Sequence, residues 1–597
     1  MRKLLCTLLV LVLVLPALAL GETAETVIYG NFYTVDAQNP HAQAVAIADG
    51  VFVYVGDAAG AEAYVGESTQ VLRYEEGVIM PGFVDAHSHG HSGGAAELFQ
   101  VTMFDCDTLE AYRERLAEFI AENEDLDVIA GTGWINSSFD SKGPSAAMID
   151  DLTDKPIILN SEDYHSYWLN SAAMAVLGID TNTPDVSDGV IVRDDAGNPT
   201  GCFRDGAGML VADLVPQYTV EQYKEAILHY QNEVLAYGET MFFEPMVNLD
   251  GTENLLTAYN QLDDEGRLLM HVYGGYQVFC DRDPIAGVER AAEIMEASRG
   301  GMFEMTNIKI QLDGVVEGLT AYLSEPYVTD EAPEGYCGEV RYDLETLAAV
   351  TQKTNELGLT MHIHAIGDAA VTLSLDAYEI AQSATGLTDQ RNAITHLQLV
   401  QPSDVQRMAD LGIVAVTNPY WFFREPGYFY ELEVPYLGEE RASGEYPMKA
   451  FFDAGVVVTS ASDYPVTIPP RPLDALQFGV IRQAAGMPET LLGESERVTA
   501  AQMIEATTIN GAFQLKCEDR LGSIAVGKEA DLVVLSSDIS VCDPETIADA
   551  ELMGTMVGGQ WVYTPSDASD LAARADRPAV HIFAHTCCTC ALNGKGT

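Results

Sequence analysis

The chain has 597 residues, more than the about 250–300 residues that one hydrophobic core usually organises, so more than one structural unit is expected. Hydrophobic residues make up 47% and charged residues 20%, which is ordinary for a folded protein and excludes a disordered chain. Acidic residues outnumber basic ones by 90 to 31, and the formal net charge of −59 excludes nucleic acid as a partner because a polyanion would be repelled.

The N-terminus has the layout of a secretory signal peptide. Arg2 and Lys3 precede an apolar run over residues 4–20, and small residues lie before the polar segment that follows. We therefore expect residues 1–21 to be a signal peptide and the protein to be secreted or extracytoplasmic. The run is about as long as the shortest membrane spans, so an uncleaved N-terminal anchor is the alternative.

Short β-rich runs near both ends of the chain predict a small β-sandwich built from two separate segments. They alternate with turn residues over residues 27–80, and matching runs return far downstream as ADLVVL and MVGGQWVY. We assign residues 22–80 and 515–565 to this sandwich. Residues 566–597 are expected to be a loosely ordered tail, and binding of a soft metal by its HTCCTC segment is the alternative.

Between these ends, apolar strand-like runs alternate with helical stretches, which is typical of a parallel βα barrel. The eight candidate strands are VIMPGFVDAH, ETMFFEP, LLMHVYGG, NIKIQLDG, LTMHIHA, AITHLQL, IVAVTNP and VVVTSASD. The predicted fold is therefore α/β, with a (β/α)8 TIM-like barrel over residues 81–514. The stretch between the first two strands is too long for one crossover, so we expect an inserted subdomain at about 93–237.

His87 and His89 end the first candidate strand. They are two residues apart, so in an extended strand both imidazoles point to one face and can hold one ion, and Asp85 shares that face. Taken alone, a structural histidine pair is the better explanation of such a motif. Its place at the end of a strand favours a metal site, because barrel enzymes collect their reactive groups there.

Lys309 lies in the fourth candidate strand, where Ile308 and Ile310 alternate with it and would face the helices. Lys309 would then lie inside the barrel, where an ammonium is costly unless it is paired or neutral. A neutral amine can add carbon dioxide to form a carbamate, whose two oxygens can bridge two metal ions. The alternative is a lysine that pairs with Asp313 or is exposed.

Three later strands end in further polar groups: His364, His396 and Asp463. Neutral imidazole is the commonest nitrogen ligand of zinc-like ions, and we favour His364 as a ligand over His362, which would lie deeper and support or pack. A carboxylate at Asp463 is hard to leave unpaired inside a barrel, and ligation of a metal would resolve this, with a capping aspartate as the alternative. Each residue alone is ambiguous, but the set on five strands is an improbable coincidence.

The sequence resembles the amidohydrolase superfamily in the segments that carry these residues, which are PGFVDAHSH, IKIQLDG, HAIGD, ITH and SASDYP. The branch it resembles most is amidohydrolase family 3, which includes N-substituted formamide deformylases. GTGW, DYHSYWLNSAAM, GNPTGCFRDGA and LGSIAVGKEADLVVL support this. The resemblance covers nearly the whole mature chain, and it is specific for the family but not for the substrate.

Six positions match the family's metal site: His87, His89, Lys309, His364, His396 and Asp463. The resemblance implies that the two histidines of the first strand hold the more buried metal with Asp463, and that the other two histidines hold the second. Lys309, if carboxylated, would bridge them, and Asp463 would shuttle a proton from the nucleophilic water to the leaving group. One or two divalent ions, with zinc first, are the expected cofactor.

Two segments depart from the family pattern and bear on substrate choice. Arg204 and Asp205 lie where many relatives have a longer acidic residue, and TNPYWFF replaces a more usual QP-type segment on strand seven. From the inserted region, Trp134 and His165 are expected to reach over the barrel mouth as substrate contacts. Packing roles are the alternative for both.

The leading prediction is an amidohydrolase-type enzyme, of EC class 3.5. It would use metal-activated water to hydrolyse a carbon–nitrogen bond other than a peptide bond, in a small amide or N-formyl compound. The same ligands also serve cyclic amides, lactones and deamination. A non-catalytic secreted metal-binding protein is the alternative from another class, but Asp463 argues against it. The expected partner is a small-molecule substrate, and a homo-oligomer is compatible with the sequence.

Overall fold

The computed structural model describes residues 23–135, 138–139, 142–161, 166–184, 189–211, 214, 217–248, 253–280, 282–298, 300–329, 332–565 and 581–582. The expected signal peptide, His165 and the HTCCTC segment lie outside these residues.

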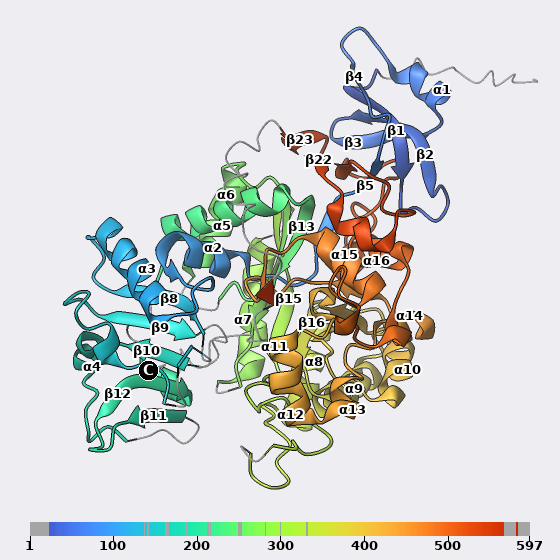
Figure 1. Ribbon diagram of the computed structural model, residues 1–597. Coiled ribbons are helices and arrows are strands. Elements are labelled where there is room, and N and C mark those ends of the chain that lie inside the picture. Colours follow the sequence, from blue (N-terminus) through green and yellow to red (C-terminus); the bar gives the residue numbers. More distant parts are fainter. Residues whose placement is uncertain are drawn as a thin grey trace, which may run out of the picture.

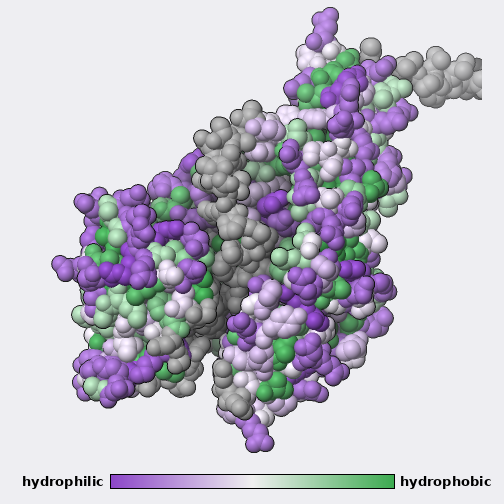
Figure 2. Space-filling model, viewed as in Figure 1, coloured by the Kyte–Doolittle hydropathy of each residue, from purple (hydrophilic) through white to green (hydrophobic). Residues whose placement is uncertain are grey.

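In Figure 1 an inserted sheet lies on one side of the barrel and a sheet made from both chain ends lies on the other. Hydrophilic side chains dominate the face drawn in Figure 2, in keeping with the acidic composition. No described helix is long and apolar enough to cross a membrane.

The central body is a barrel of parallel strands, as predicted. Its strands are β6 (Phe83–Asp85), β13 (Glu239–Glu244), β14 (His271–Gln277), β15 (Phe303–Gln311), β16 (Thr360–Ala365), β17 (Ala393–His396), β18 (Val414–Thr417) and β19 (Val458–Ser460). Successive strands pair side by side from β6 to β19. The Ala86 amide then donates to the Ser460 carbonyl at 2.9 Å, which joins the two edge strands and closes the barrel.

Helices cover the outside of the barrel, and the largest hydrophobic core lies between them and the strands. They include α5 (Val220–Leu235), α6 (Asn254–Asp264), α7 (Pro284–Ala297), α8 (Leu344–Glu356), α9 (Asp368–Thr385), α10 (Pro402–Leu411), α14 (Met448–Ala454) and α15 (Pro472–Ile481). Ile308 and Ile310 of β15 belong to this core, as their alternation with Lys309 predicts. Side-chain caps set helix starts: the Asp343 carboxylate, for example, accepts from the Thr346 amide at 2.7 Å at the start of α8.

The sheet made from both chain ends forms the predicted composite sandwich. Its strands are β1 (Thr26–Tyr33), β2 (His41–Ala48), β3 (Val51–Gly56), β4 (Gln70–Arg73), β5 (Val78–Pro81), β21 (Leu532–Leu535), β22 (Leu552–Val557) and β23 (Gln560–Tyr563). The first half of β1 pairs with β4 and its second half reaches β5, which itself pairs with β21. Residues from both ends, such as Phe32, Ile79 and Leu532, therefore share one core.

The first predicted barrel strand is divided between two bodies. β5 belongs to the sandwich, and only β6 belongs to the barrel. Gly82 lies between them, where a Cβ atom would lie 2.2 Å from the Thr240 hydroxyl oxygen. Only glycine fits at this crossing without displacing β13. A continuous apolar run in the sequence could not reveal the change of sheet.

The inserted subdomain is a separate six-stranded sheet with helices. It comprises β7 (Val101–Thr102), α3 (Leu109–Glu122), β8 (Ile129–Trp134), β9 (Ile157–Ser161), β10 (Ser166–Leu169), α4 (Ser171–Leu177), β11 (Gly189–Arg193) and β12 (Pro199–Asp205). It leaves the barrel after α2 (Gly90–Phe99) and returns before α5. Separate clusters of buried apolar residues cover its sheet, one of them packed with α3 and the other with α4.

A buried ion pair joins the barrel to the sandwich at the start of β14. The Nε2 atom of His271 lies 3.2 Å from a carboxylate oxygen of Asp531 and 3.5 Å from one of Glu529. His271 is 3% exposed and Asp531 is 5% exposed. Burial opposes a charged imidazole, but Asp531 and Glu529 outweigh it, so the pKa of His271 is raised above its ordinary value.

We expect His271→Gln to destabilise the protein at pH 6 by about 1–3 kcal/mol, because it leaves Asp531 buried without its charged partner. A raised pKa in the folded state stabilises fully below the unfolded value of about 6.5, and this stabilisation is lost as pH rises through the folded pKa. The melting-temperature difference between wild type and variant should therefore shrink in alkaline buffer. Calorimetry across pH checks this, and a difference that stays constant or grows with pH would contradict it.

Candidate metal centre

The six predicted ligands all gather where the barrel strands end. They are His87 and His89 after β6, Lys309 in β15, His364 in β16, His396 at the end of β17 and Asp463 after β19. Every one of them is buried, His89 being the most exposed at 6%. Groups that are dispersed over most of the barrel sequence therefore share one enclosed site, as expected for a barrel enzyme.

Asp463 lies at the middle of the first group of contacts. Its Oδ1 atom is 3.5 Å from Nε2 of His87 and 3.4 Å from Nε2 of His89. The Nζ atom of Lys309 lies 3.3 Å from the same nitrogen of His87. One ligand atom each from His87, His396 and Asp463 lie within 4.8 Å of one another, which leaves a divalent ion within reach of all three.

The other two histidines are held through their second ring nitrogens. Nδ1 of His364 lies 3.0 Å from a carboxylate oxygen of Asp313, and Nδ1 of His396 lies 3.0 Å from the side-chain oxygen of Asn418. Each acceptor fixes the tautomer that leaves Nε2 as the electron-pair donor. Nε2 of His364 is buried and has no hydrogen-bond partner among the described residues. This donor set fits a divalent metal, because such an orphaned nitrogen would otherwise be costly.

Further buried residues support the first pair of histidines. Nε2 of His362 lies 2.8 Å from Nδ1 of His87, which makes His362 a supporting residue deeper in the barrel. One carboxylate oxygen of Glu244 lies 2.7 Å from Nδ1 of His91, and the other lies 3.8 Å from Nδ1 of His89. Glu244 was missed in the sequence, although it ends an apolar strand run just as Asp463 does.

Asp313 pairs with His364, whereas Lys309 was the partner considered from the sequence. In the structure its carboxylate accepts from the ring of His364. It also accepts from the Tyr322 amide at 3.0 Å and from the Gly367 amide at 2.9 Å. Lys309 is fully buried beside His87. The alternative of an exposed lysine is therefore excluded.

The protonation states suit metal binding. Burial lowers the pKa of His87, His362 and His364 well below the ordinary value, and Lys309 lowers it further. Burial opposes ionisation of Asp463, but the neighbouring rings of His89 and His396 outweigh this and lower its pKa. Neutral imidazoles at His87 and His364 beside an ionised carboxylate are the forms that a metal ion requires.

The chain turn after β6 differs from the expected extended strand. β6 ends at Asp85, and His89 lies just before α2 with φ −98° and ψ 57°. The Asp85 carboxylate accepts from the His87 amide and the Ser462 amide, both at 3.1 Å, and from the Ser462 hydroxyl. His87 and His89 therefore converge through a turn pinned to the last strand, and not through a shared strand face.

Two of the predicted ligands adopt backbone conformations that are rare outside glycine. His396 has φ 78° and Asp463 has φ 56°, both in the left-handed region. Such residues cost about 1–3 kcal/mol each and persist where the surrounding structure determines them. Here the left-handed backbone at each residue directs its side chain toward the shared site at the strand ends.

The TNPYWFF segment on strand seven lies against a predicted ligand. It supplies Asn418, which holds His396, and Trp421, whose ring stacks on His396 at 5.8 Å between centroids and an interplanar angle of 21°. Trp134 instead lies in the core of the inserted sheet, where it is 0% exposed and its indole N–H donates to the Leu159 carbonyl at 3.1 Å. Its position is that of a packing residue.

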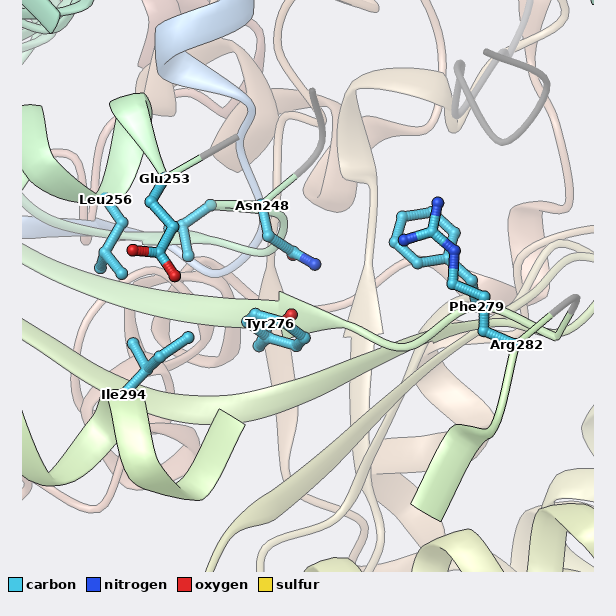
Figure 3. Close-up of a pocket in the computed structure, with 8 residues that line it drawn as sticks. Asn248, Glu253, Leu256, Tyr276, Phe279, Arg282 and Ile294 are labelled. Atoms are coloured by element: carbon cyan, nitrogen blue, oxygen red, sulfur yellow. The ribbon is translucent and has the colours of Figure 1, made fainter. Parts of the chain in front are cut away.

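A cavity of about 120 Å³ lies beside the strand ends, between β14 and helices α6 and α7 (Figure 3). Tyr276 of β14 meets Leu256 of α6 and Ile294 of α7 at one end, and the guanidinium of Arg282 lies 5.0 Å from the Phe279 ring centroid at the other. None of the predicted metal ligands is among its described lining residues. This cavity is therefore separate from the candidate metal centre.

Comparisons with known proteins identify the family of the chain and similar folds. A family model described as "Amidohydrolase family" matches residues 75–563. The protein LONG AFTER FAR-RED 3 of Arabidopsis thaliana is 28% identical over 89% of this chain and 90% of its own length. An N-substituted formamide deformylase of Arthrobacter pascens is 28% identical over 90% of this chain and 98% of its own length. Among solved structures, an uncharacterized metal-dependent hydrolase from Pyrococcus furiosus has the same fold, with a TM-score of 0.69, 24% identity and coverage of 86% of this chain and 99% of that one.

We expect Asn418→Ala to weaken Zn²⁺ binding by about 10–100-fold, because His396 loses the acceptor that orients its ring. The matched variant Asn418→Asp keeps that acceptor oxygen and should bind Zn²⁺ at least as tightly as wild type. Competition with a chromophoric chelator measures both affinities. Wild-type affinity in Asn418→Ala would show that His396 is not oriented through Asn418.

Proposed function

The chain belongs to the amidohydrolase family and is a metal-dependent hydrolase, and on that premise we propose that it cleaves a carbon–nitrogen bond, other than a peptide bond, in a small amide or N-formyl compound. The observation that carries the proposal is the buried donor set. Imidazole nitrogens from three strands face a carboxylate whose pKa is lowered, and Asp313 and Asn418 hold two of the rings.

In this proposal His87, His89 and Asp463 would hold one divalent ion, and His364 and His396 would hold a second. A bound ion of this kind lowers the pKa of water to about 7 and polarises a carbonyl, which is the chemistry that amide hydrolysis needs. Zinc is the metal we propose first, since imidazole and carboxylate are its usual ligands at catalytic sites. The buried position of the site would keep bulk water away from the reacting groups.

Asp463 is proposed as the proton carrier. It is ionised and buried, and its Oδ1 atom lies between two histidine nitrogens at 3.4 and 3.5 Å. From there it would accept the proton of the attacking water and return it to the departing nitrogen, which must leave as a neutral amine. A purely structural metal site would not need a proton carrier on the last strand, and this favours an enzyme over a non-catalytic binding protein.

The choice of an amide or N-formyl substrate is supported by the deformylase relative, which this chain matches over nearly its whole length. Cyclic amides, lactones and amines that undergo deamination present an electrophilic carbon to the same groups and are the second candidate class. Trp421 beside His396 belongs to a segment that departs from the family pattern, so we propose that it shapes the choice among these substrates.

Carboxylation of Lys309 is a further part of the proposal. Its amine is fully buried and lies 3.3 Å from a ring nitrogen of His87. A neutral amine in this setting would add carbon dioxide, and the carbamate oxygens would then bridge the two ions. We also propose an extracytoplasmic location, which is supported by the sequence of residues 1–21 alone.

The proposed function predicts that the purified full chain hydrolyses at least one member of a panel of N-formyl and simple amides, and that a chelator removes this activity. Asp463→Asn should lower kcat by about 10²–10⁴-fold, the range of a lost general base. Release of amine is the measurement. The control Asp410→Asn changes an exposed aspartate on α10 and should leave activity unchanged.

Either of two results would contradict this mechanism. Turnover that is indifferent to metal removal would exclude the metal, and full activity in Asp463→Asn would exclude its role as the proton carrier. Turnover of lactones or amines without any amide would instead select the second candidate class.

For Lys309 we expect native mass spectrometry of the metal-loaded chain, kept in bicarbonate, to show an increase equal to the mass of one carbon dioxide. The increase should disappear in Lys309→Arg, because a guanidinium stays charged and forms no carbamate. Unmodified protein with a full metal complement and full activity would exclude the carbamate.

A further inference from the structure

A second cluster of metal-ligating side chains lies between helices α2 and α5, outside the candidate metal centre. Glu97 of α2 and His229 and Glu233 of α5 each offer a ligand atom, and these atoms lie within 4.8 Å of one another. Nε2 of His229 is 2.9 Å from one carboxylate oxygen of Glu97. His229 and Glu233 are four residues apart, so they lie on one face of α5, opposite Glu97.

The two helices cross closely beside this cluster. A Cβ atom on Gly94 of α2 would lie 2.3 Å from the carbonyl oxygen of Ala226 of α5, so glycine is needed at the crossing. Glu97 lies one helical turn beyond Gly94, and His229 lies about one turn beyond Ala226. The side chains of Glu97 and His229 are each 12% exposed, and Glu233 is 5% exposed as a residue.

Tyrosine hydroxyls hold both carboxylates. The Tyr464 hydroxyl donates to Oε1 of Glu97, and the Tyr237 hydroxyl donates to Oε1 of Glu233, both at 3.2 Å. Carboxylates that bind metals are commonly fixed in this way by outer donors. Oε2 of Glu97 faces His229, so the tyrosine does not occupy the side of Glu97 that would bind an ion.

A second observation shows that buried carboxyl groups crowd this region. Glu239, the first residue of β13, is 0% exposed, and neither of its carboxylate oxygens has a hydrogen-bond partner within the described part of the chain. Burial, Asp85 and Glu233 raise its pKa well above the ordinary value.

We propose that Glu97, His229 and Glu233 form a second, structural metal site that takes a divalent transition-metal ion such as Zn²⁺ or Mn²⁺. One imidazole with two carboxylates is a mixed nitrogen and oxygen donor set, which suits these ions, whereas Ca²⁺ and Mg²⁺ prefer oxygen alone. Two carboxylates would neutralise the ion, and water would complete its coordination. This site is distinct from the one on which the proposed function rests.

The site would brace the candidate metal centre. α2 begins directly after His89, and Tyr464, which contacts Glu97, directly follows Asp463. The His89 amide donates to the Tyr464 carbonyl at 2.8 Å. An ion that ties Glu97 to α5 would therefore restrain both the helix that carries His89 and the tyrosine next to Asp463.

The test is the metal content of the intact chain after loading with Zn²⁺ and desalting, measured by inductively coupled plasma mass spectrometry. We expect His229→Gln and Glu233→Gln each to hold one ion fewer per chain than wild type. Glu225→Gln is the matched control, because Glu225 is an exposed acid one turn earlier on α5, and it should retain the wild-type content. Circular dichroism verifies that each variant is folded, and two independent variants guard against the failure of one.

Equal metal content in wild type and both folded variants would overturn the proposal. The same comparison in a His364→Gln background separates this site from the candidate metal centre: the ion that His229→Gln removes should still be bound there. Because the readout is a count of ions, it does not depend on any substrate. Failure of the amide assays would leave it unaffected, and its own failure would leave the proposed hydrolysis standing.

Discussion

Closure of the barrel between its first and last strands is the constraint on which the rest of the site depends. The Asp85 carboxylate accepts from the amide and the hydroxyl of Ser462, residues that are 377 positions apart in the chain. Next to it the Asp463 amide donates to the His87 carbonyl at 2.8 Å. His87, His89 and Asp463 are neighbours only because these bonds join β6 to β19. Without closure, the acid and the histidines would lie on opposite edges of an open sheet.

Formation of the candidate metal centre costs free energy when no ion is bound. It collects buried imidazoles, an amine and a carboxylate in one place, and two of these residues adopt left-handed backbone conformations. Asp313, Asn418 and Glu244 offset part of this cost by accepting from, or lying beside, the outward nitrogens of the histidines. Local strain and buried polarity of this kind are characteristic of sites that are selected for chemistry rather than stability.

The two additions to the barrel have different relations to the site. The sandwich connects to β6 through Gly82, where the chain passes from one sheet to the other. Its ion pair with His271 lies at the start of β14, whereas the predicted metal ligands lie at the other end of the barrel strands. It therefore acts on the stability of the barrel and not on the chemistry. The inserted sheet follows α2, whose first residue comes directly after His89, so its attachment lies close to the candidate centre. Trp134 nevertheless packs inside that sheet.

The sequence by itself determined the barrel, the composite sandwich and the dispersed set of candidate ligands, because apolar runs of strand length, several of them ended by a histidine or an acid, are a local signal. Only the tertiary structure decided which groups meet. The division of the first run between β5 and β6, the pairing of Asp313 with His364, and the support given by Asn418, Glu244 and His362 depend on strands that are adjacent in space and remote in sequence. Hydrogen bonds between such strands leave no periodicity in one chain, since each partner alone is an ordinary buried polar residue.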